Sequence, residues 1–113
     1  MSKKKVFRLT AAQAVIRFMI SQKVKIKGEV KPLFPGIWAI FGHGNVAGIG
    51  EALFQYQEEL PTYRGQNEQS MAHAAIAYSK TLNRQQVMAC TSSAGPGSTN
   101  IITAAALAHI NRI

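Results

Sequence analysis

Two short apolar segments, each followed by glycine-rich residues and a helical pattern, restrict this chain to few folds. The first, residues 36–41, precedes GHGNVAGIG (42–50), and the second, residues 87–91, precedes SSAGPGSTN (92–100). Short apolar runs rich in β-forming residues are typical of buried strands. Strands that alternate with helices indicate an α/β fold, in which a parallel sheet carries helices on both faces.

Further elements are predicted from helical periodicity and from start and stop signals. Thr10 and Asn67 are good N-caps, and Pro61 would end a helix. At 113 residues the chain fits at most one domain, and the alternation stops where another strand is due, so we expect a C-terminally truncated domain. The expected helices cover residues 10–21, 51–60, 67–82 and 99–109, the last capped by Ser98 or Thr99, with a short strand at 62–64 and a loop or small hairpin at 22–35.

The net charge of +8 is concentrated in one part of the chain. Nine of the 13 Lys and Arg residues lie within residues 1–31, where Glu29 is the only acid, and the remaining residues are balanced. A nucleic-acid interface is expected to interleave basic residues with aromatics or to place them on a groove-fitting helix. Neither pattern is present, so we interpret the charge as a solvated N-terminal tail and a solvated loop at Lys23, Lys25, Lys27 and Lys31.

The sequence favours a cytoplasmic protein with no membrane span. Its apolar stretches are shorter than the ~20 residues that cross a bilayer, and its basic N-terminus lacks the cleavage site of a signal peptide. Cys90 is the only cysteine, so no internal disulfide or thiolate zinc cluster is expected. Because Cys90 lies within a strand pattern, a packed thiol is favoured over a reactive one.

The first glycine-rich segment fits G-x-G-x-x-A, the pattern of a dinucleotide-binding turn. In that motif an acidic residue ends the second strand about 20 residues later. Glu58 and Glu59 are near that distance but fall at the end of a predicted helix. A non-catalytic Rossmann-like nucleotide module therefore stays an alternative, beside the simpler interpretation of glycines in a tight turn with His43 as a capping or surface residue.

Glu68 has the most informative position among the five acidic residues. An acid in the first turn of a helix is stabilised by the helix dipole by ~0.3–1 kcal/mol, which explains Glu68 without a function. The alanine-rich helix that follows is thin, so Glu68 could approach a partner surface. His73 lies about 140° around the helix from Glu68 and is not expected to form a dyad with it. The second glycine-rich segment could hold a polar ligand on its backbone N–H groups.

Two motifs at this separation resemble the pyrimidine-binding domain of thiamine-diphosphate enzymes, in the group of acetohydroxyacid synthase and pyruvate oxidase. They are RGQNEQSMAHAAIAYSK (64–80) and VMACTSSAGPGSTNIITAAALA (87–108), and the resemblance covers the chain after the lysine-rich segment.

Within the group, three features are most similar to the hydrolase branch of myo-inositol catabolism, which opens the ring of a trihydroxycyclohexane-dione by C–C cleavage to give 5-deoxyglucuronate. These are GIWAIFGHGNVAGIGEAL, NEQ in place of HEQ, and the lengthened ACTSSAGPGSTN. The synthases usually have a Gly-Tyr-Pro-Gly turn where this chain has residues 42–45. An acetohydroxyacid synthase-like carboligase or decarboxylase is the alternative within the family.

The resemblance implies roles for six residues. Glu68 would hydrogen-bond N1′ of the aminopyrimidine of thiamine diphosphate and exchange a proton there, which promotes loss of the thiazolium C2 proton. Burial by the cofactor would raise the pKa of this glutamate. The wall facing the cofactor would be shaped by Gly95, Pro96 and Gly97, and the substrate would be contacted by His43 and Asn45.

The resemblance also implies a Mg²⁺ ion, bound with the diphosphate by a G-D-G…N-N motif in a separate domain, usually of another subunit. The chain contains no aspartate and so cannot hold that motif. We assign no metal ligand here and interpret residues 1–113 as the incomplete N-terminal part of the pyrimidine-binding domain. A small-molecule substrate and a second subunit are the expected partners, in a homodimer or dimer of dimers, and the fragment alone is expected to be inactive and to aggregate.

Overall fold

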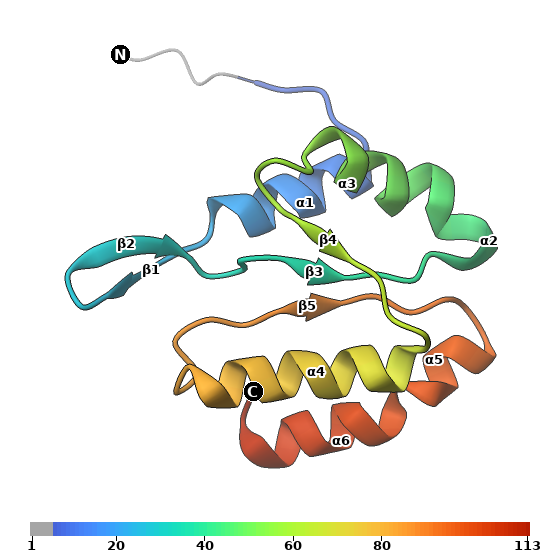
Figure 1. Cartoon of the computed structure of the whole chain (residues 1–113). Coiled ribbons are helices and arrows are strands. Elements are labelled where there is room, and N and C mark those ends of the chain that lie inside the picture. Colours follow the sequence, from blue (N-terminus) through green and yellow to red (C-terminus); the bar gives the residue numbers. More distant parts are fainter. Residues whose placement is uncertain (1–5) are drawn as a thin grey trace.

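The chain forms a three-stranded parallel sheet with helices on both faces (Figure 1). A computed structural model describes residues 6–113, so Lys3, Lys4 and Lys5 of the predicted tail lie outside the described residues. The strand order is β4-β3-β5, which confirms the predicted α/β fold with a parallel sheet. The strands are β3 (Ile37–Trp38), β4 (Thr62–Tyr63) and β5 (Ala89–Cys90).

The central strand β3 pairs with both neighbours in parallel. Ile37 is in register with Thr62 and Ala89, and Trp38 with Tyr63 and Cys90. The ladder continues at its carboxyl end, where Ala39 N donates to Tyr63 O at 2.9 Å and Thr91 N donates to Trp38 O at 2.9 Å. The strands are shorter than the predicted apolar runs, because only their central residues pair as regular sheet.

The first helix, α1 (Ala11–Ser21), begins at the predicted N-cap. Gln13 N donates to Thr10 Oγ1 at 3.2 Å, and Thr10 N donates to Gln13 Oε1 at 2.9 Å. These reciprocal bonds form a capping box, in which two backbone donors at the helix end gain partners.

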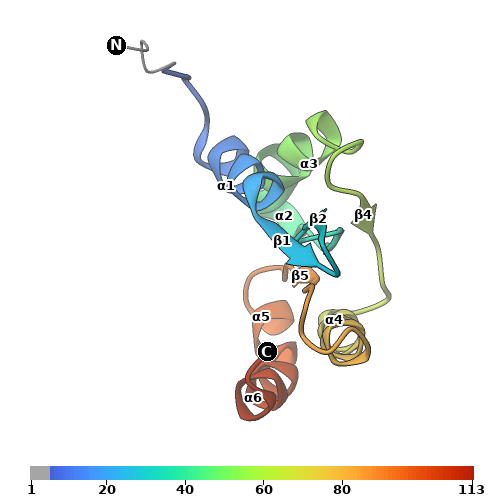
Figure 2. The same cartoon turned by 90° about the vertical axis from the view of Figure 1, so that its left-hand side faces the viewer.

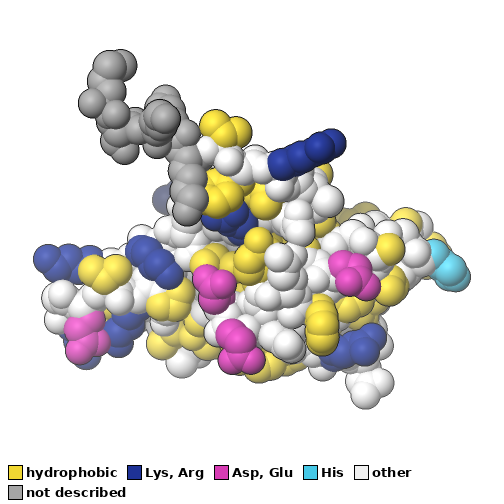
Figure 3. Space-filling view, turned by 90° about the horizontal axis from the view of Figure 1, so that it is seen from above, with side chains coloured by type: hydrophobic (Ala, Val, Ile, Leu, Met, Phe, Trp, Pro, Cys, Tyr) yellow, Lys and Arg dark blue, Asp and Glu magenta, His cyan; other side chains and the backbone are white. Residues whose placement is uncertain are grey.

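The lysine-rich segment forms an antiparallel hairpin of β1 (Lys23–Ile26) and β2 (Glu29–Pro32). Its turn is made by Lys27 and Gly28, which both have positive φ. Every residue of β2 is exposed, and basic side chains are prominent at this end of the molecule (Figure 3). The hairpin alternative is thus confirmed, and the exposure fits the interpretation of a solvated basic segment.

The segment 42–50, predicted as a turn, is helical instead. α2 (Gly42–Asn45) leads through a π-helical turn, η1 (Val46–Gly50), into α3 (Glu51–Gln55). Gly42 makes the change of direction alone with a φ of 60°, and the next glycines have ordinary helical geometry. The predicted helix 51–60 was too long, since α3 ends at Gln55 and turns lead to Leu60.

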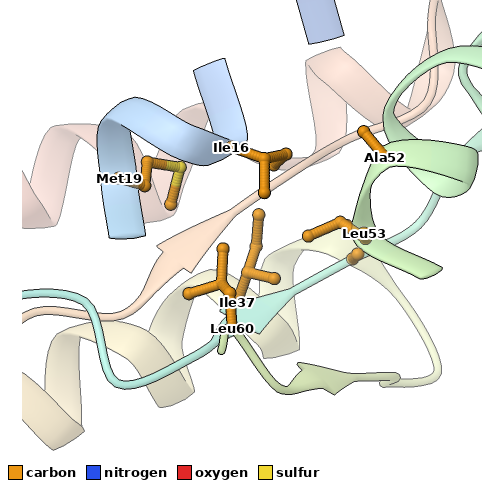
Figure 4. Packing of buried hydrophobic residues seen from close by; sticks show 7 residues of the cluster. Ile16, Met19, Ile37, Ala52, Leu53 and Leu60 are labelled. Carbon is orange, nitrogen blue, oxygen red and sulfur yellow. The ribbon is translucent and has the colours of Figure 1, made fainter. Parts of the chain in front are cut away.

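A hydrophobic core lies between the sheet and the helices α1 and α3 (Figure 4). β3 contributes the side chains that face it, and Leu60 closes it from the segment before β4. These side chains interdigitate and remove apolar surface from water, which is the main favourable contribution to folding. The buried members are Ile16, Met19, Ile37, Ala39, Ala52, Leu53 and Leu60.

The opposite face is covered by α4 (Glu68–Thr81), with α5 (Pro96–Asn100) and α6 (Ile102–Asn111) beside it (Figures 1 and 2). The predicted N-cap of α4 is confirmed, because Ser70 N donates to the Asn67 side chain at 2.9 Å. Small side chains bring α4 and α6 together in a second cluster, as expected for a thin helix. Its buried members are Ala72, Ile76 and Ala104.

The predicted start of the last helix was wrong. Neither Ser98 nor Thr99 caps it, since α5 begins at Pro96 and is separated from α6 at Ile101. Proline suits the first position of a helix because its φ is already helical and its missing N–H has no partner there. Among residues 6–113, no helix combines the length and apolarity that a membrane crossing requires.

Replacement of Leu53 by alanine tests the core. Leu53 is 2% exposed, so Leu53→Ala should lower the free energy of unfolding by about 2–5 kcal/mol through lost burial and a cavity. Phe54→Ala is the matched control, because the adjacent Phe54 is 71% exposed and its loss should change stability by no more than about 0.5 kcal/mol. Urea unfolding of the full-length variants, followed by hydrogen exchange of the peptides that cover β3 and α3, measures both, and equal losses would contradict this core.

Candidate functional site

Glu68 lies where helix α4 meets the loop that follows β5. Its side chain is largely buried, with the residue 8% exposed. Glu68 Oε1 accepts a hydrogen bond from Ser93 Oγ at 2.8 Å and a longer one from Ser93 N at 3.5 Å. Glu68 therefore does not face bulk solvent as an isolated helix-cap acid would. It is attached to the second glycine-rich segment.

Two glycines allow this close approach. A Cβ atom built at Gly97 would overlap Glu68 Oε1 and Ser93 Oγ. A Cβ atom at Gly42 would lie 2.7 Å from Ser93 Cβ, and the positive φ of Gly42 also disfavours a side chain. Ser93 thus sits between the first glycine-rich segment and α5, with its hydroxyl directed at Glu68.

The end of β3 is fastened to the end of β5 by one threonine. Ile40 N donates to Thr91 Oγ1 at 3.1 Å, and Thr91 Oγ1 donates to Ile40 O at 2.9 Å. These bonds hold the two glycine-rich segments side by side just beyond the sheet. Such corners at the carboxyl ends of parallel strands are the usual place for ligands in open α/β sheets.

Glu68 opens onto a broad surface pocket. The pocket has a volume of about 910 Å³, at the upper end of the ~300–1,000 Å³ typical of ligand sites. Its floor is the carboxylate and the first turn of α5. The lining residues are Glu68, Pro96, Gly97, Thr99 and Asn100.

Gly95 shapes this wall without lining the pocket. It has a φ of 66° and a ψ of −121°, a backbone conformation that favours glycine. Its carbonyl accepts from Thr99 N at 3.1 Å and from Thr99 Oγ1 at 3.3 Å. Gly95 therefore sets the direction in which α5 leaves the loop. Of the residues predicted for this wall, Pro96 and Gly97 line the pocket with Glu68.

The surroundings of Glu68 favour its ionised form. Hydrogen bonds from its own backbone N–H and from the Ser93 hydroxyl hold the pKa of Glu68 below its usual range, and partial burial opposes them more weakly. A donor to a carboxylate stabilises the charge, whereas loss of water destabilises it. The expected rise in this pKa depends on burial by a cofactor and stays a prediction.

This arrangement suits a flat heterocycle that carries a ring nitrogen. The carboxylate can accept a hydrogen bond from a protonated nitrogen or, once protonated, donate one. Gly97 leaves the space beside the carboxylate that a Cβ would fill, so a planar ring can come close. The residues present therefore fit the aminopyrimidine that the sequence predicts.

The predicted substrate residues lie on the first glycine-rich segment, apart from the pocket of Glu68. His43 is exposed on α2. Asn45 lines another pocket, beside α1, together with Thr10 and Val15. The structure links their segment to Glu68 through Gly42 and Ser93, and the contact of both residues with substrate stays a prediction.

Cys90 is half-buried under α4 and α6, in agreement with the prediction of a packed thiol. Burial raises the pKa of the Cys90 thiol to about 11, with a further contribution from the Glu68 charge. Since the thiolate is the nucleophilic form, this raised pKa disfavours reaction of Cys90 near neutrality. Within residues 6–113, no group of three His, Cys, Asp or Glu side chains is placed to hold a metal ion.

Three polar residues of the site were missed by sequence reasoning. Ser93 donates to Glu68, and Thr99 and Asn100 line the pocket. All three lie in the second glycine-rich segment, whose position beside Glu68 was predicted. The adjacent serines 92 and 93 look equivalent in sequence, and only the folded loop decides which one faces the acid.

The structure lacks, among the described residues, the acidic residue that a dinucleotide-binding motif places at the end of its second strand. Glu58 and Glu59 are exposed in the turns after α3, whereas the motif needs an acid at the end of a strand. The glycines of this segment serve the start of a helix and the packing against Ser93.

Comparison with known proteins agrees with the site. The family described as "Thiamine pyrophosphate enzyme, N-terminal TPP binding domain" matches residues 39–113. A 3D-(3,5/4)-trihydroxycyclohexane-1,2-dione hydrolase of Listeria monocytogenes serotype 4b (strain F2365) is 53% identical over 96% of this chain and 17% of its own length. A protein of the same name from Lacticaseibacillus casei is 51% identical over 99% of this chain and 17% of its own length.

The relative named 3D-(3,5/4)-trihydroxycyclohexane-1,2-dione hydrolase 2, from Bacillus cereus (strain ZK / E33L), is 52% identical over 94% of this chain and 16% of its own length. The chain thus spans about one sixth of the length of these curated relatives. No solved structure matches it significantly. On the family match over residues 39–113, the chain belongs to the thiamine pyrophosphate enzymes, within their N-terminal cofactor-binding domain.

Proposed function

We propose that this chain is part of a hydrolase that opens the ring of 3D-(3,5/4)-trihydroxycyclohexane-1,2-dione by C–C cleavage, giving 5-deoxyglucuronate in myo-inositol catabolism. The observation that carries the proposal is the buried carboxylate of Glu68 at the pocket floor. Identities of 51–53% to proteins named for this activity support the choice of substrate. On this proposal, residues 1–113 form the N-terminal, incomplete part of the pyrimidine-binding domain.

Glu68 acts as the proton carrier in this proposal. Thiamine diphosphate, when bound, would supply a nucleophilic carbon and an electron sink for cleavage of the C–C bond, and the reaction would consume one water molecule. Glu68 would hydrogen-bond N1′ of the aminopyrimidine and exchange a proton with it. Glutamine could form a hydrogen bond there but could not transfer the proton, and aspartate would be one methylene too short.

The other residues of the pocket position the ring and limit the space around it. Pro96 and Gly97 form the wall at the first turn of α5, and Asn100 offers an amide on the same side. A bound ring would shield Glu68 from water, which raises the pKa of a carboxylate toward the operating pH of a proton carrier. The donors already present oppose that rise, so the free carboxylate is ionised and ready to receive a proton.

The rest of the active site would come from outside this chain. The diphosphate and Mg²⁺ would be bound by another domain of a second subunit, in a homodimer or dimer of dimers. His43 and Asn45 would contact the substrate from the first glycine-rich segment. The single cysteine fits a cytoplasmic protein.

Turnover by the full-length protein with thiamine diphosphate and Mg²⁺ tests the substrate. The cyclic dione should be consumed with formation of 5-deoxyglucuronate, whereas pyruvate should not be converted to acetolactate. Product analysis by NMR distinguishes the two reactions. Acetolactate formation without ring opening would replace the hydrolase by the synthase alternative.

Substitution of the proposed proton carrier tests its role. Glu68→Gln should lower kcat by roughly 10²–10⁴-fold, the usual contribution of general acid–base catalysis, and should slow exchange of the cofactor C2 proton similarly. Glu51→Gln is the matched control, since Glu51 also lies in the first turn of a helix but is exposed, and it should retain wild-type rates. Equal exchange rates in wild type and Glu68→Gln would remove Glu68 from the mechanism.

The space at Gly97 gives a separate prediction. Gly97→Ala should weaken binding of thiamine diphosphate by about tenfold or more, because an overpacked methyl group costs about 1–3 kcal/mol. Gly48→Ala is the control, as a Cβ atom there would meet nothing within 4 Å. Calorimetric titration of the full-length variants with the cofactor measures both affinities, and an unchanged affinity for Gly97→Ala would show that the ring does not approach this wall.

A further inference from the structure

We propose that Ser93 is a positioning residue for Glu68, whose hydroxyl fixes the carboxylate toward the pocket and keeps it ionised until a ligand arrives. This inference rests on the proposed function of Glu68 and adds a second residue to the site. Its basis is the 2.8 Å bond from Ser93 Oγ to Glu68 Oε1. Ser93 is 25 residues from Glu68 in the sequence and lies in the loop between β5 and α5.

Two glycines permit the contact from both sides of the serine. A Cβ atom at Gly42 would lie 2.7 Å from Ser93 Cβ, and a Cβ atom at Gly97 would overlap Ser93 Oγ and Glu68 Oε1. The hydroxyl and the carboxylate can therefore meet only because both positions lack a side chain.

The backbone of Ser93 is fastened in addition. Ser98 Oγ, on α5, donates to Ser93 O at 2.8 Å. Ser92 Oγ lies 3.2 Å from Ser98 Oγ and has no hydrogen bond to Glu68 among the described residues. The two neighbouring serines thus have different partners: the Ser93 hydroxyl bonds to Glu68, and the Ser92 hydroxyl bonds to Ser98.

Both hydrogen bonds from Ser93 end on the same carboxylate oxygen, Oε1. These bonds restrict the orientation of the carboxylate and leave Oε2 without a hydrogen bond from Ser93. Ordering a glutamate side chain costs conformational entropy. Here the orientation exists beforehand, which lowers the cost of forming the productive contact.

Few ionisable groups can disturb this pair. The segment packed on the carboxylate, residues 91–100, contains no ionisable side chain. The Cys90 thiol of β5 interacts with the Glu68 charge and stays protonated, with its pKa raised to about 11. The other titratable groups of the neighbouring elements are His73, Tyr78 and Lys80 on α4, Tyr63 and Arg64 before it, His43 on α2 and His109 on α6. The Ser93 hydroxyl therefore has a direct effect on the titration of Glu68.

Carbodiimide labelling of the full-length, cofactor-free protein tests the inference, because this reagent modifies carboxyl groups more rapidly as they become protonated. Trypsin releases residues 65–80 as one peptide, in which Glu68 is the only acidic side chain, so mass spectrometry reports this group alone. The exposed Glu51, Glu58 and Glu59 serve as internal references. Labelling is followed between pH 4 and pH 6.5.

Ser93→Ala should label Glu68 several-fold faster than wild type at a given pH in this range. Removal of the donor raises the pKa of Glu68 toward its ordinary value, so protonation begins at higher pH. Ser92→Ala, which removes the neighbouring hydroxyl, should label like wild type. Labelling of the reference carboxylates should be the same in all variants.

Thiamine diphosphate with Mg²⁺ should protect Glu68 from labelling in wild type and in Ser93→Ala. Wild-type labelling in a Ser93→Ala variant that retains this protection would overturn the positioning role and leave the proposed function intact. No protection in wild type would overturn the proposed function, while the cofactor-free comparison would still decide the role of Ser93.

If the cofactor protects Glu68 in wild type but not in Ser93→Ala, the variant Ser93→Thr tests the role of the hydroxyl, because threonine keeps it. Slow, wild-type labelling in Ser93→Thr supports the inference, and labelling as fast as in Ser93→Ala overturns it.

Discussion

The parallel pairing of β3 with β4 and β5 determines where every functional residue lies. Because all three strands run in one direction, the segments that follow them emerge at one edge of the sheet. Gly42 follows β3, Glu68 follows β4, and Ser93 follows β5. Thr91 fastens two of these segments together. The sheet therefore brings together three short segments that are far apart in the sequence.

Much of this arrangement could be predicted because its signals are local. The apolar strands and the N-caps Thr10 and Asn67 specify their elements directly. The helical state of residues 42–50 could not be predicted, since glycines favour turns and only packing around Gly42 and Phe41 decides otherwise. Likewise, the equivalence of Ser92 and Ser93 in sequence is broken only by the register of the folded loop. Local sequence signals thus predict the helices and strands and the position of Glu68, whereas tertiary contacts select Ser93 as its hydrogen-bond partner.

The site balances two opposing effects on one carboxylate. Hydrogen bonds from the backbone and Ser93 stabilise the charge of Glu68, and burial destabilises it. In the cofactor-free chain the donors prevail. A ring that covers the pocket would strengthen the second effect without removing the first. A carboxyl group that must both receive and release a proton benefits from this balance, since too strong a preference for either form would slow one of the two transfers.

A side chain at position 42 would overlap Ser93, so two positions that are far apart in the sequence depend on each other. A Cβ atom at position 42 would lie 2.7 Å from Ser93 Cβ, so only glycine at position 93, which has no hydroxyl, would remove that overlap. Substitutions at the two positions should therefore be strongly non-additive in their effects. The packing of the first glycine corner and the hydrogen bond to the acid at the start of α4 thus depend on the same residue, Ser93.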